Sequence, residues 1–200
     1  LGGNITLTVV APSNTKNVSF EFYNGTEYNE TFKLDGNAVD GWTAAFNTSR
    51  YADDIHYGFR ANATDELGVY IDNDEIINLT FDNTAPTVTL DIPVASREYK
   101  GIVTVNASSS ADTDKVRFEY RVGTGDWVVI GEAFSAPYKV DWSTVGLQDA
   151  TNYEVRANAT DKAGLTATDS NTNVEIDNTA PVITLNNPAG GSTVSGTVNV

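Results

Sequence analysis

The residues whose type and spacing could carry chemistry are first of all asparagines in the pattern Asn-x-Ser/Thr, which accepts N-linked glycans. With 20 Asn and 37 Ser or Thr among 200 residues, random order would give roughly 4 such sites. Nine occur, seven of them before residue 84: Asn4, Asn17, Asn24, Asn29, Asn47, Asn62, Asn78, Asn106 and Asn158. The alternation of apolar and polar residues places Asn24 and Asn47 in loops and the others on outward-facing strand positions. We predict a glycosylated surface; the alternative is that Asn and Thr are simply frequent on exposed strand faces.

Acidic residues at repeated positions form the second candidate site. The string Asp-Asn-Thr-Ala-Pro occurs at residues 82–86 and again at 177–181, and an Asp opens a turn at positions 65 and 161. Ca²⁺ takes about six to eight oxygen ligands, which carboxylates, Asn amides and backbone carbonyls supply. We predict calcium at the junctions between repeats, held by Asp82, Asn83, Asp177, Asn178, Asp65 and Asp161. The alternative is that these residues only start turns by bonding their own backbone, while Pro fixes φ.

Catalytic chemistry finds little support in the sequence. His56 is the one histidine, and no nucleophile elbow, zinc-binding His-Glu-x-x-His or phosphate-binding glycine loop is present. Carboxylate pairs for glycoside hydrolysis are not excluded by counting, but acids shared by both repeats are typical of structure. The sequence therefore predicts no enzyme. Trp42, Trp127 and Trp142 could form a sugar-binding platform, but their positions favour core packing, with Trp42 the most exposed.

Composition excludes several classes of partner. The chain has 12 Lys and Arg against 27 Asp and Glu, a net charge of −15, which disfavours nucleic acids and anionic membrane surfaces. Apolar runs such as residues 127–130 are too short to span a bilayer, so we expect no membrane insertion in this segment. The absence of Cys excludes disulfides and thiolate metal sites. The chain shows no signal peptide and opens within a pattern, which predicts a piece of a longer, processed protein.

Internal repetition defines how the chain is organised. Besides Asp-Asn-Thr-Ala-Pro, the string Arg-Ala-Asn-Ala-Thr-Asp occurs at 60–65 and 156–161, so the period is about 95 residues, one small domain per repeat. We predict a domain over 1–83 that lacks its first strand, a complete domain over 84–178, and the first strands of a third domain over 179–200.

Each repeat has the pattern of β-strands. Apolar residues alternate with polar ones at 116–122 and 153–159, and Asn-Gly or Asp-x-x-Gly turns separate the runs. Thr, Val, Ile and aromatic residues are abundant, and no helical apolar stripe is present. About seven short strands in such a repeat predict an all-β fold of tandem antiparallel β-sandwiches.

The repeats resemble the immunoglobulin-like (Ig-like) domains found in tandem in bacterial and archaeal surface proteins. The matching features are the Asp-Asn-Thr-Ala-Pro junctions, the Ala-Thr-Asp-x-x-Gly turns, and a Tyr at 57 and 153 where such sandwiches place a tyrosine corner. The disulfide of antibody domains is absent. The resemblance implies the sandwich fold and an extracellular, cell-surface location, and the sequon count leans towards archaea.

Two functions fit this pattern. The first is structural: tandem glycosylated repeats that build an S-layer, a stalk or a surface filament by self-association. The second is an adhesin stalk or a carbohydrate- or cell-binding module, with an accessory domain of a secreted hydrolase as a weaker option. The similarity of the two repeats favours a structural role, because neither has distinctive loops. A strand donated by another subunit to the first repeat is a further alternative.

Overall fold

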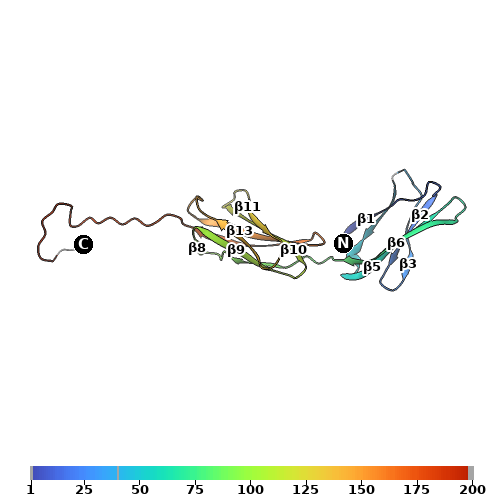
Figure 1. Cartoon of the computed structure of the whole chain (residues 1–200), viewed down its shortest axis with the longest axis horizontal. Helices are drawn as coiled ribbons and strands as arrows, with labels where there is room; N and C mark the ends of the chain where they lie inside the picture. Colours follow the sequence, from blue (N-terminus) through green and yellow to red (C-terminus); the bar gives the residue numbers. More distant parts are fainter. Residues whose placement is uncertain (1, 40, 198–200) are drawn as a thin grey trace.

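The computed structural model describes residues 2–39 and 41–197, and in this part of the chain two β-sandwiches follow one another end to end (Figure 1). The first sandwich contains β1 (Asn4–Val9), β2 (Asn17–Tyr23), β3 (Tyr28–Asp35), β4 (Trp42–Asn47), the 3-10 turn η1 (Thr48–Arg50), β5 (Asp54–Thr64) and β6 (Tyr70–Phe81). The second contains β7 (Val88–Ile92), β8 (Glu98–Tyr99), β9 (Ile102–Ser109), β10 (Thr113–Val122), β11 (Val128–Ala133), β12 (Tyr138–Ser143), β13 (Ala150–Asp161) and β14 (Thr166–Ile176). This architecture confirms the all-β fold class.

The first sandwich packs a sheet of order β3-β2-β5-β6 against the antiparallel pair β1-β4. Strict alternation along β2 turns Val18, Phe20 and Phe22 inward, where each is at most 2% exposed. One half of this core is aromatic. Five rings pack together there: Phe22, Phe46, Phe59, Phe81 and Tyr57. Their mutual packing compensates for the small number of strands, because each buried ring removes a large apolar area from water.

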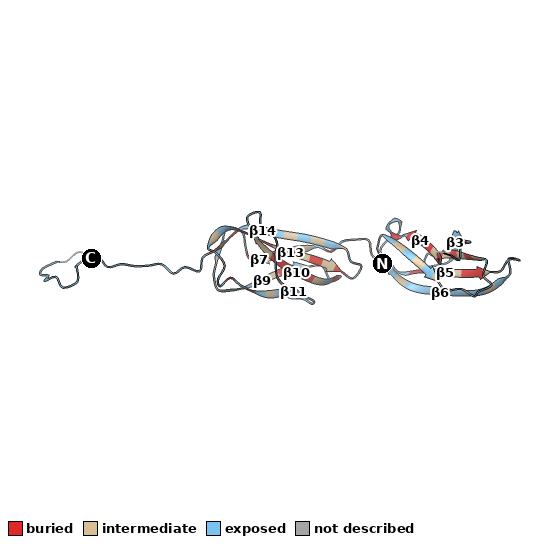
Figure 2. Cartoon of the chain, turned by 90° about the horizontal axis from the view of Figure 1, so that it is seen from above, coloured by how far each residue is buried: buried red, intermediate tan, exposed pale blue. Residues whose placement is uncertain are grey.

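The second sandwich has one more strand in its smaller sheet. Its sheets have the orders β11-β10-β13-β14-β8 and β12-β9-β7. Val105, Phe118 and Val155 are completely buried between the two sheets, and Trp142 is 3% exposed. The same alternation that buries these residues leaves the outer faces of the strands pale in the burial-coloured view (Figure 2). The extra strand, β7, has no counterpart among the described residues of the first sandwich.

The tail beyond β14 lies away from both sandwiches (Figure 1). No strand is assigned between residues 177 and 197. Val182 and Ile183 are 91% and 96% exposed, although their sequence pattern is that of a strand. The expected third domain over 179–200 therefore stays a prediction.

A tyrosine corner stabilises the second sandwich. The Tyr153 hydroxyl donates a 2.7 Å hydrogen bond to the carbonyl of Gln148, and the ring is 1% exposed. Burial raises the pKa of Tyr153, so the hydroxyl is protonated and able to donate at neutral pH. The sequence placed this Tyr correctly at the corner position.

Replacing Tyr153 by Phe should lower the free energy of unfolding of the second sandwich by about 0.5 to 1.5 kcal/mol, because the hydrogen bond from the hydroxyl of this buried ring to the Gln148 carbonyl is lost. Urea unfolding followed by amide exchange of second-sandwich peptides measures this. Tyr70→Phe, at a position 67% exposed in the first sandwich, is the control and should leave stability unchanged. Equal effects of the two substitutions would contradict the assignment.

Candidate metal centre

One asparagine side chain closes each sandwich at the end where the chain leaves it. The Asn83 Oδ1 accepts hydrogen bonds from the backbone N–H of Gly3 (3.2 Å) and the hydroxyl of Thr48 (2.8 Å), while its Nδ2 donates to the Thr48 carbonyl (3.2 Å). Asn83 thus ties the start of β1, the β4–β5 connection and the end of β6 together. Its position in the chain is the second residue of the repeated Asp-Asn-Thr-Ala-Pro string.

The second sandwich repeats this arrangement. The Asn178 Oδ1 accepts from the N–H of Gly101 (3.0 Å) and the hydroxyl of Thr144 (3.3 Å), and its Nδ2 donates to the Thr144 carbonyl (3.0 Å). Because the same bonds recur, the repeated string has a structural task in both copies. The side-chain oxygens of Asn83 and Asn178 are engaged within their own sandwiches, apart from the acidic cluster described below.

An aspartate carboxylate accepts hydrogen bonds from the chain where it leaves each sandwich. Asp149 Oδ1 accepts from the N–H of Asn178 (2.7 Å), and its Oδ2 accepts from the Thr179 hydroxyl. In the first sandwich Asp53 binds the N–H of Asn83 (2.7 Å) and the hydroxyl of Thr84 (2.5 Å) in the same way. These bonds favour the charged carboxylate. The pKa of Asp149 is lowered mainly by the Asn178 N–H, and that of Asp53 mainly by the Thr84 hydroxyl.

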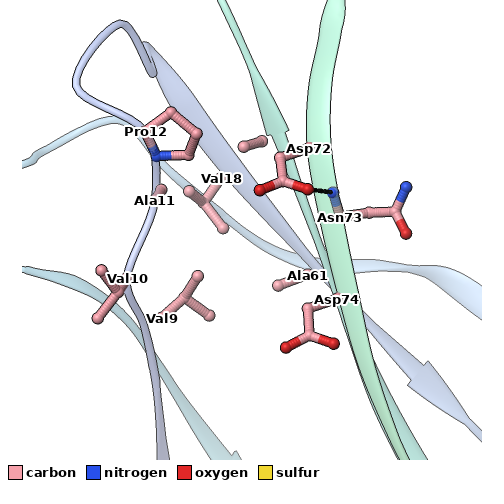
Figure 3. A pocket seen from close by; sticks show the side chains of 10 residues that line it. Val9, Val10, Ala11, Pro12, Val18, Ala61, Asp72, Asn73 and Asp74 are labelled. Carbon is pink, nitrogen blue, oxygen red and sulfur yellow. Dashed lines mark hydrogen bonds between the residues drawn. The ribbon is translucent and has the colours of Figure 1, made fainter.

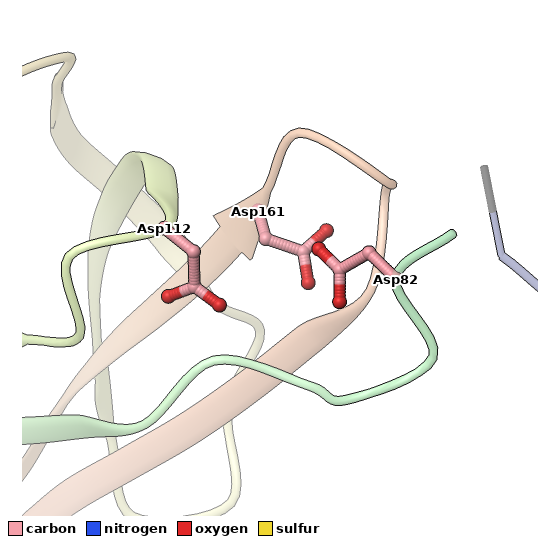
Figure 4. Close-up of side chains that lie close together, drawn as sticks. All are labelled: Asp82, Asp112 and Asp161. Carbon is pink, nitrogen blue, oxygen red and sulfur yellow. The ribbon is translucent and has the colours of Figure 1, made fainter. Parts of the chain in front are cut away.

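Three carboxylates meet where the chain passes from the first sandwich to the second. One oxygen each of Asp82, Asp112 and Asp161 lies within 4.8 Å of the others. Asp82 follows β6 of the first sandwich, whereas Asp112 lies in the turn before β10 and Asp161 is the last residue of β13 in the second (Figure 4). The cluster is therefore composite and forms only when the two sandwiches are held in this relative position.

The geometry of Asp161 points to a cation. Its side chain is 2% exposed, and its Oδ1 accepts the N–H of Leu165 (2.9 Å), which fixes the turn after β13. Its Oδ2 is buried without a hydrogen-bond partner. The carboxylate of Asp161 as a whole faces that of Asp82 (Figure 4). A buried carboxylate oxygen without a donor is costly, and neighbouring carboxylates add repulsion. None of the three acids forms a salt bridge with a described residue. Hard carboxylate oxygens in this arrangement fit Ca²⁺.

The six residues predicted to hold calcium separate into different roles. Asp82 and Asp161 come together, and Asp112, which sequence reasoning missed, joins them. Asp65 occupies the turn of the first sandwich that corresponds to Asp161, where its Oδ1 binds the N–H groups of Leu67 and Val69. Asp177 caps the N–H of Thr179 at the far end of the second sandwich. The signal for Asp112 was its position at a turn between two strands, which alone does not reveal its neighbours.

The sequon asparagines differ in accessibility, and one expectation about them is wrong. Asn62 has the outward-facing register that was expected, but it is not exposed as a glycan acceptor requires: it is only 6% exposed, because it lies on the central strand β5 between Ser19 and Asn73. Asn158 is half-buried; its Nδ2 donates to Glu119 (2.9 Å) and its Oδ1 accepts from Thr168 (2.5 Å). Five sequon asparagines are exposed (Asn4, Asn24, Asn29, Asn47 and Asn78), and Asn17 and Asn106 are half-buried.

The three tryptophans do not form an exposed sugar-binding platform. Trp42, expected to be the most exposed tryptophan, is 7% exposed and packs in the first core, so that expectation is wrong. Trp142 is buried as expected. Trp127 lies on the outer face, where the guanidinium groups of Arg156 and Arg121 stack 3.9 and 4.5 Å from its ring centroid. The one histidine, His56, is exposed on β5.

Comparisons with known proteins agree with this fold. Residues 86–157 match the family of bacterial Ig domains. Fibronectin(III)-like modules of CbhA from Clostridium thermocellum share 24% identity with the chain over 88% of it and 85% of theirs, with a TM-score of 0.55. The FN1–FN3 domains of chicken CNTN1 share 12% identity over 86% of this chain and 64% of theirs, with a TM-score of 0.50. A search of curated proteins gives no match.

The chain thus has the fold of tandem Ig-like β-sandwiches, as its residues implied, and residues 86–157 of its second sandwich match the bacterial Ig domain. Among the described residues no helix has the length and apolar character needed to cross a membrane.

The hydrogen bonds that Asp53 and Asp149 accept predict that the free energy of unfolding depends on pH. Since their folded pKa values lie below the ordinary value of 3.8, their stabilisation is complete above that pH and is lost as the pH falls through the lower folded pKa. The free energy of unfolding should therefore decline below about pH 4. Thermal unfolding from pH 2 to 7 measures it. Asp149→Asn should flatten this acid limb, and an unchanged limb in that variant would contradict the role of Asp149.

Proposed function

We propose that this chain is a non-catalytic structural module of an extracellular surface assembly, such as a stalk, a filament or an S-layer, in which calcium stiffens the junction between Ig-like domains. The observation that carries the proposal is the composite cluster of Asp82, Asp112 and Asp161, with its buried unpartnered oxygen. A module that only displayed loops would not need carboxylates from two domains at one hinge.

Calcium would act here by joining the two sandwiches. The ion would bind Asp82 from the first and Asp112 and Asp161 from the second, so relative rotation would break ligand bonds. Without it, like charges at this distance favour separation of the sandwiches. The close approach of the chain start supports a defined interface, since a Cβ on Gly2 would lie 3.9 Å from the Cβ of Ala163. The acidic surface, with a net charge of −15, suits a cation-rich extracellular medium.

Calcium titration of the full chain by calorimetry tests this proposal. We expect a junction site with a Kd of about 10⁻⁴ to 10⁻³ M, as in extracellular modules. Asp161→Asn should weaken binding at least about tenfold while keeping an acceptor for the Leu165 N–H. Scattering or a distance probe between the sandwiches should show a narrower range of orientations when calcium is added.

Asp65→Asn is the matched control, because Asp65 occupies the corresponding turn of the first sandwich and lies outside the cluster. Its calcium affinity should equal that of the unsubstituted chain. The proposal fails if Asp161→Asn and Asp65→Asn bind calcium equally, or if calcium leaves the orientation of the two sandwiches unchanged.

We also propose that the module carries N-linked glycans, mainly on the first sandwich. The five exposed sequon asparagines all lie there. In two of them, Asn24 in the loop after β2 and Asn47 at the end of β4, the sequon hydroxyl itself donates to the Asn Oδ1, at 2.8 and 2.6 Å. A glycan coat on the first sandwich would protect an exposed assembly and raise its solubility.

Mass spectrometry of the protein from its own cells should find glycan mass on the peptides of Asn24, Asn47 and Asn78. The buried Asn62 should be unmodified, because a glycan there requires the β5 surface to open. Deglycosylated peptide maps serve as the control. Full occupancy at Asn62 with bare peptides at Asn24 and Asn47 would refute the link between exposure and modification.

A further inference from the structure

Strand β11 lies at an edge of the second sandwich (Figure 2), and among the described strands it pairs only with β10. The other edges of this sandwich are protected. Strand β8 has only two residues, β12 carries the exposed Lys139 and Asp141, and side chains of β14 bond the backbone of β7 at Leu90. Short strands, charged side chains and covering groups are the usual means by which sheet edges avoid pairing with other chains.

The edge at β11 is apolar instead. Val128 and Val129 are 47% and 48% exposed, and Phe134, just beyond the strand, is 67% exposed. The one charged residue of the strand is Glu132, whose carboxylate lies 3.4 Å from the Lys115 ammonium of the same sandwich. β11 therefore presents its backbone between apolar side chains, with its single charge already paired. This is the type of surface to which another strand adds.

The corresponding strand of the first sandwich, β3, is protected. It has the same place at the edge of its sheet, and its Lys33 lies opposite the buried Phe20. On β11 it is Gly131 that lies opposite the equivalent buried residue, Phe118. Lys33 thus stands where β11 has no side chain. A charged residue at an inward-facing position of an edge strand disfavours pairing, so the two sandwiches differ at this edge.

Charge and sequons also disfavour contacts between copies along the first sandwich. Figure 3 shows the carboxylates of Asp72 and Asp74 on β6, and like charges repel across a strand pair. The exposed sequon residues Asn24 and Asn29 lie before and on β3, whereas no sequon occurs in residues 107–157, which include β11. In a chain with a net charge of −15, two copies meet at the least electrostatic cost along a segment such as β11.

An irregularity in β11 determines which strand fits its edge. The register against β10 shifts at Ile130, so that two consecutive residues face the core. Two residues of the strand face outward and four face inward: outward are Val129 and Glu132, and inward are Val128, Ile130, Gly131 and Ala133. The order along the strand is in, out, in, in, out, in, and it is the same in both directions.

This symmetry favours a second copy of the same strand. Residues opposite one another in an antiparallel pair share a face of the sheet. A regular strand alternates strictly, so it would match β11 only on one side of the shift. A second β11 that runs antiparallel has the same shift at the same place, so all of its residues match.

We propose that β11 pairs antiparallel with β11 of a second copy of the chain, around a two-fold axis at the centre of the strand. In this register Val128 lies opposite Ala133 of the second copy, and Val129 lies opposite Glu132. The two Glu132 carboxylates are three residues apart along the strands, roughly 10 Å, which exceeds the screening length of about 8 Å at physiological salt. The larger sheets of the two copies join into one, which removes the exposed apolar edge from water.

The edge is already in place before the copies meet. A Cβ on Gly131 would lie 3.2 Å from the Cγ1 of Val140, so β11 packs directly against β12 of the smaller sheet. At the start of the strand, the guanidinium groups of Arg156 and Arg121 stack 3.9 and 4.5 Å from the ring centroid of Trp127. A strand held at both places loses little conformational entropy on pairing.

This inference deepens the proposed assembly by naming a contact between copies, and it rests on that proposed function only for its biological purpose. The strands run along the length of the molecule (Figure 1), so the pair sets two chains side by side in opposite directions. Such a contact suits a filament or a sheet better than stalks that stand parallel on one surface. The calcium cluster lies outside β11, so Asp161→Asn should self-associate normally. Self-association without calcium binding, or calcium binding without self-association, therefore shows which of the two proposals has failed.

Sedimentation equilibrium of the full chain, produced without glycans, tests the contact. Because the six residues of β11 form a smaller interface than that of stable dimers, we expect a monomer–dimer equilibrium with a Kd of about 10⁻⁵ to 10⁻³ M. Val129→Asp places a carboxylate opposite Glu132 of the second copy and should weaken the dimer at least about tenfold. Val129→Lys places an ammonium there and should keep the dimer or strengthen it.

Leu34→Asp is the matched control, because Leu34 is an apolar residue of β3 that is 62% exposed. Its Kd should equal that of the unsubstituted chain, and thermal unfolding of each variant separates lost pairing from lost folding. The proposal fails if the unsubstituted chain is monomeric at about 1 mM. It also fails if Val129→Asp and Leu34→Asp have the same Kd, or if Val129→Lys weakens the dimer as much as Val129→Asp.

Disulfide trapping tests the register separately, because the natural sequence has no Cys. The double variant Val129→Cys with Glu132→Cys should form disulfide-linked dimers under mild oxidation, since the two positions lie opposite one another on one face. Val128→Cys with Glu132→Cys puts the thiols on opposite faces of the joined sheet and should give at least about fivefold less dimer. Equal yields from the two variants would contradict the antiparallel pairing of β11 with itself.

Discussion

The structure depends on one constraint: each sandwich must hold together, at a single point, the start of one strand of its smaller sheet (β1 or β9), the loop after the partner strand (β4 or β12) and the end of its last strand (β6 or β14). Asn83 and Asn178 meet this constraint with one amide, which accepts from a glycine N–H and a threonine hydroxyl and donates to that threonine's carbonyl. An amide suits this task because it has both acceptors and donors, whereas a carboxylate would have to leave a carbonyl without a donor. The flanking Asp and Thr of the string then fix the chain as it leaves.

The position at which the chain leaves the first sandwich also determines which side chain lies against the second sandwich. Asp82 is the residue before Asn83, so the bonds of Asn83 set where its carboxylate lies. Asp112 and Asp161 lie at the end of the second sandwich that faces the first, next to the carboxylate of Asp82. The hydrogen bonds of Asn83 and the position of the acidic cluster thus both follow from the local geometry of the repeated Asp-Asn-Thr-Ala-Pro string. This relation explains why a turn motif and a metal ligand are neighbours in the same repeated string.

The sequence predicted the strands well because burial alternates with a period of two along β2 and most of β13. It could not predict what covers the outer face. Asn62 on β5 and Glu119 on β10 both point outward, yet neighbouring strands flank them on both sides, and Glu119 lies under Arg156 at 2.7 Å. Alternation gives the face of a sheet, whereas burial also depends on the length of cross-strand neighbours. Asp53, Asp112 and Asp149 were missed for a related reason: their partners lie about 30 or more residues away in the sequence.

The first strand of a sandwich belongs to two structural units at once in this architecture. β7 completes the second core, but it begins two residues after the junction string that closes the first sandwich. The connection that leads into β7 is short, yet the bonds of β7 are to β9 and β14 of the second sandwich rather than to that connection. An apolar strand edge that must be covered therefore governs the closure of the second domain. A junction stiffened by calcium would then fix the direction in which the second sandwich follows the first.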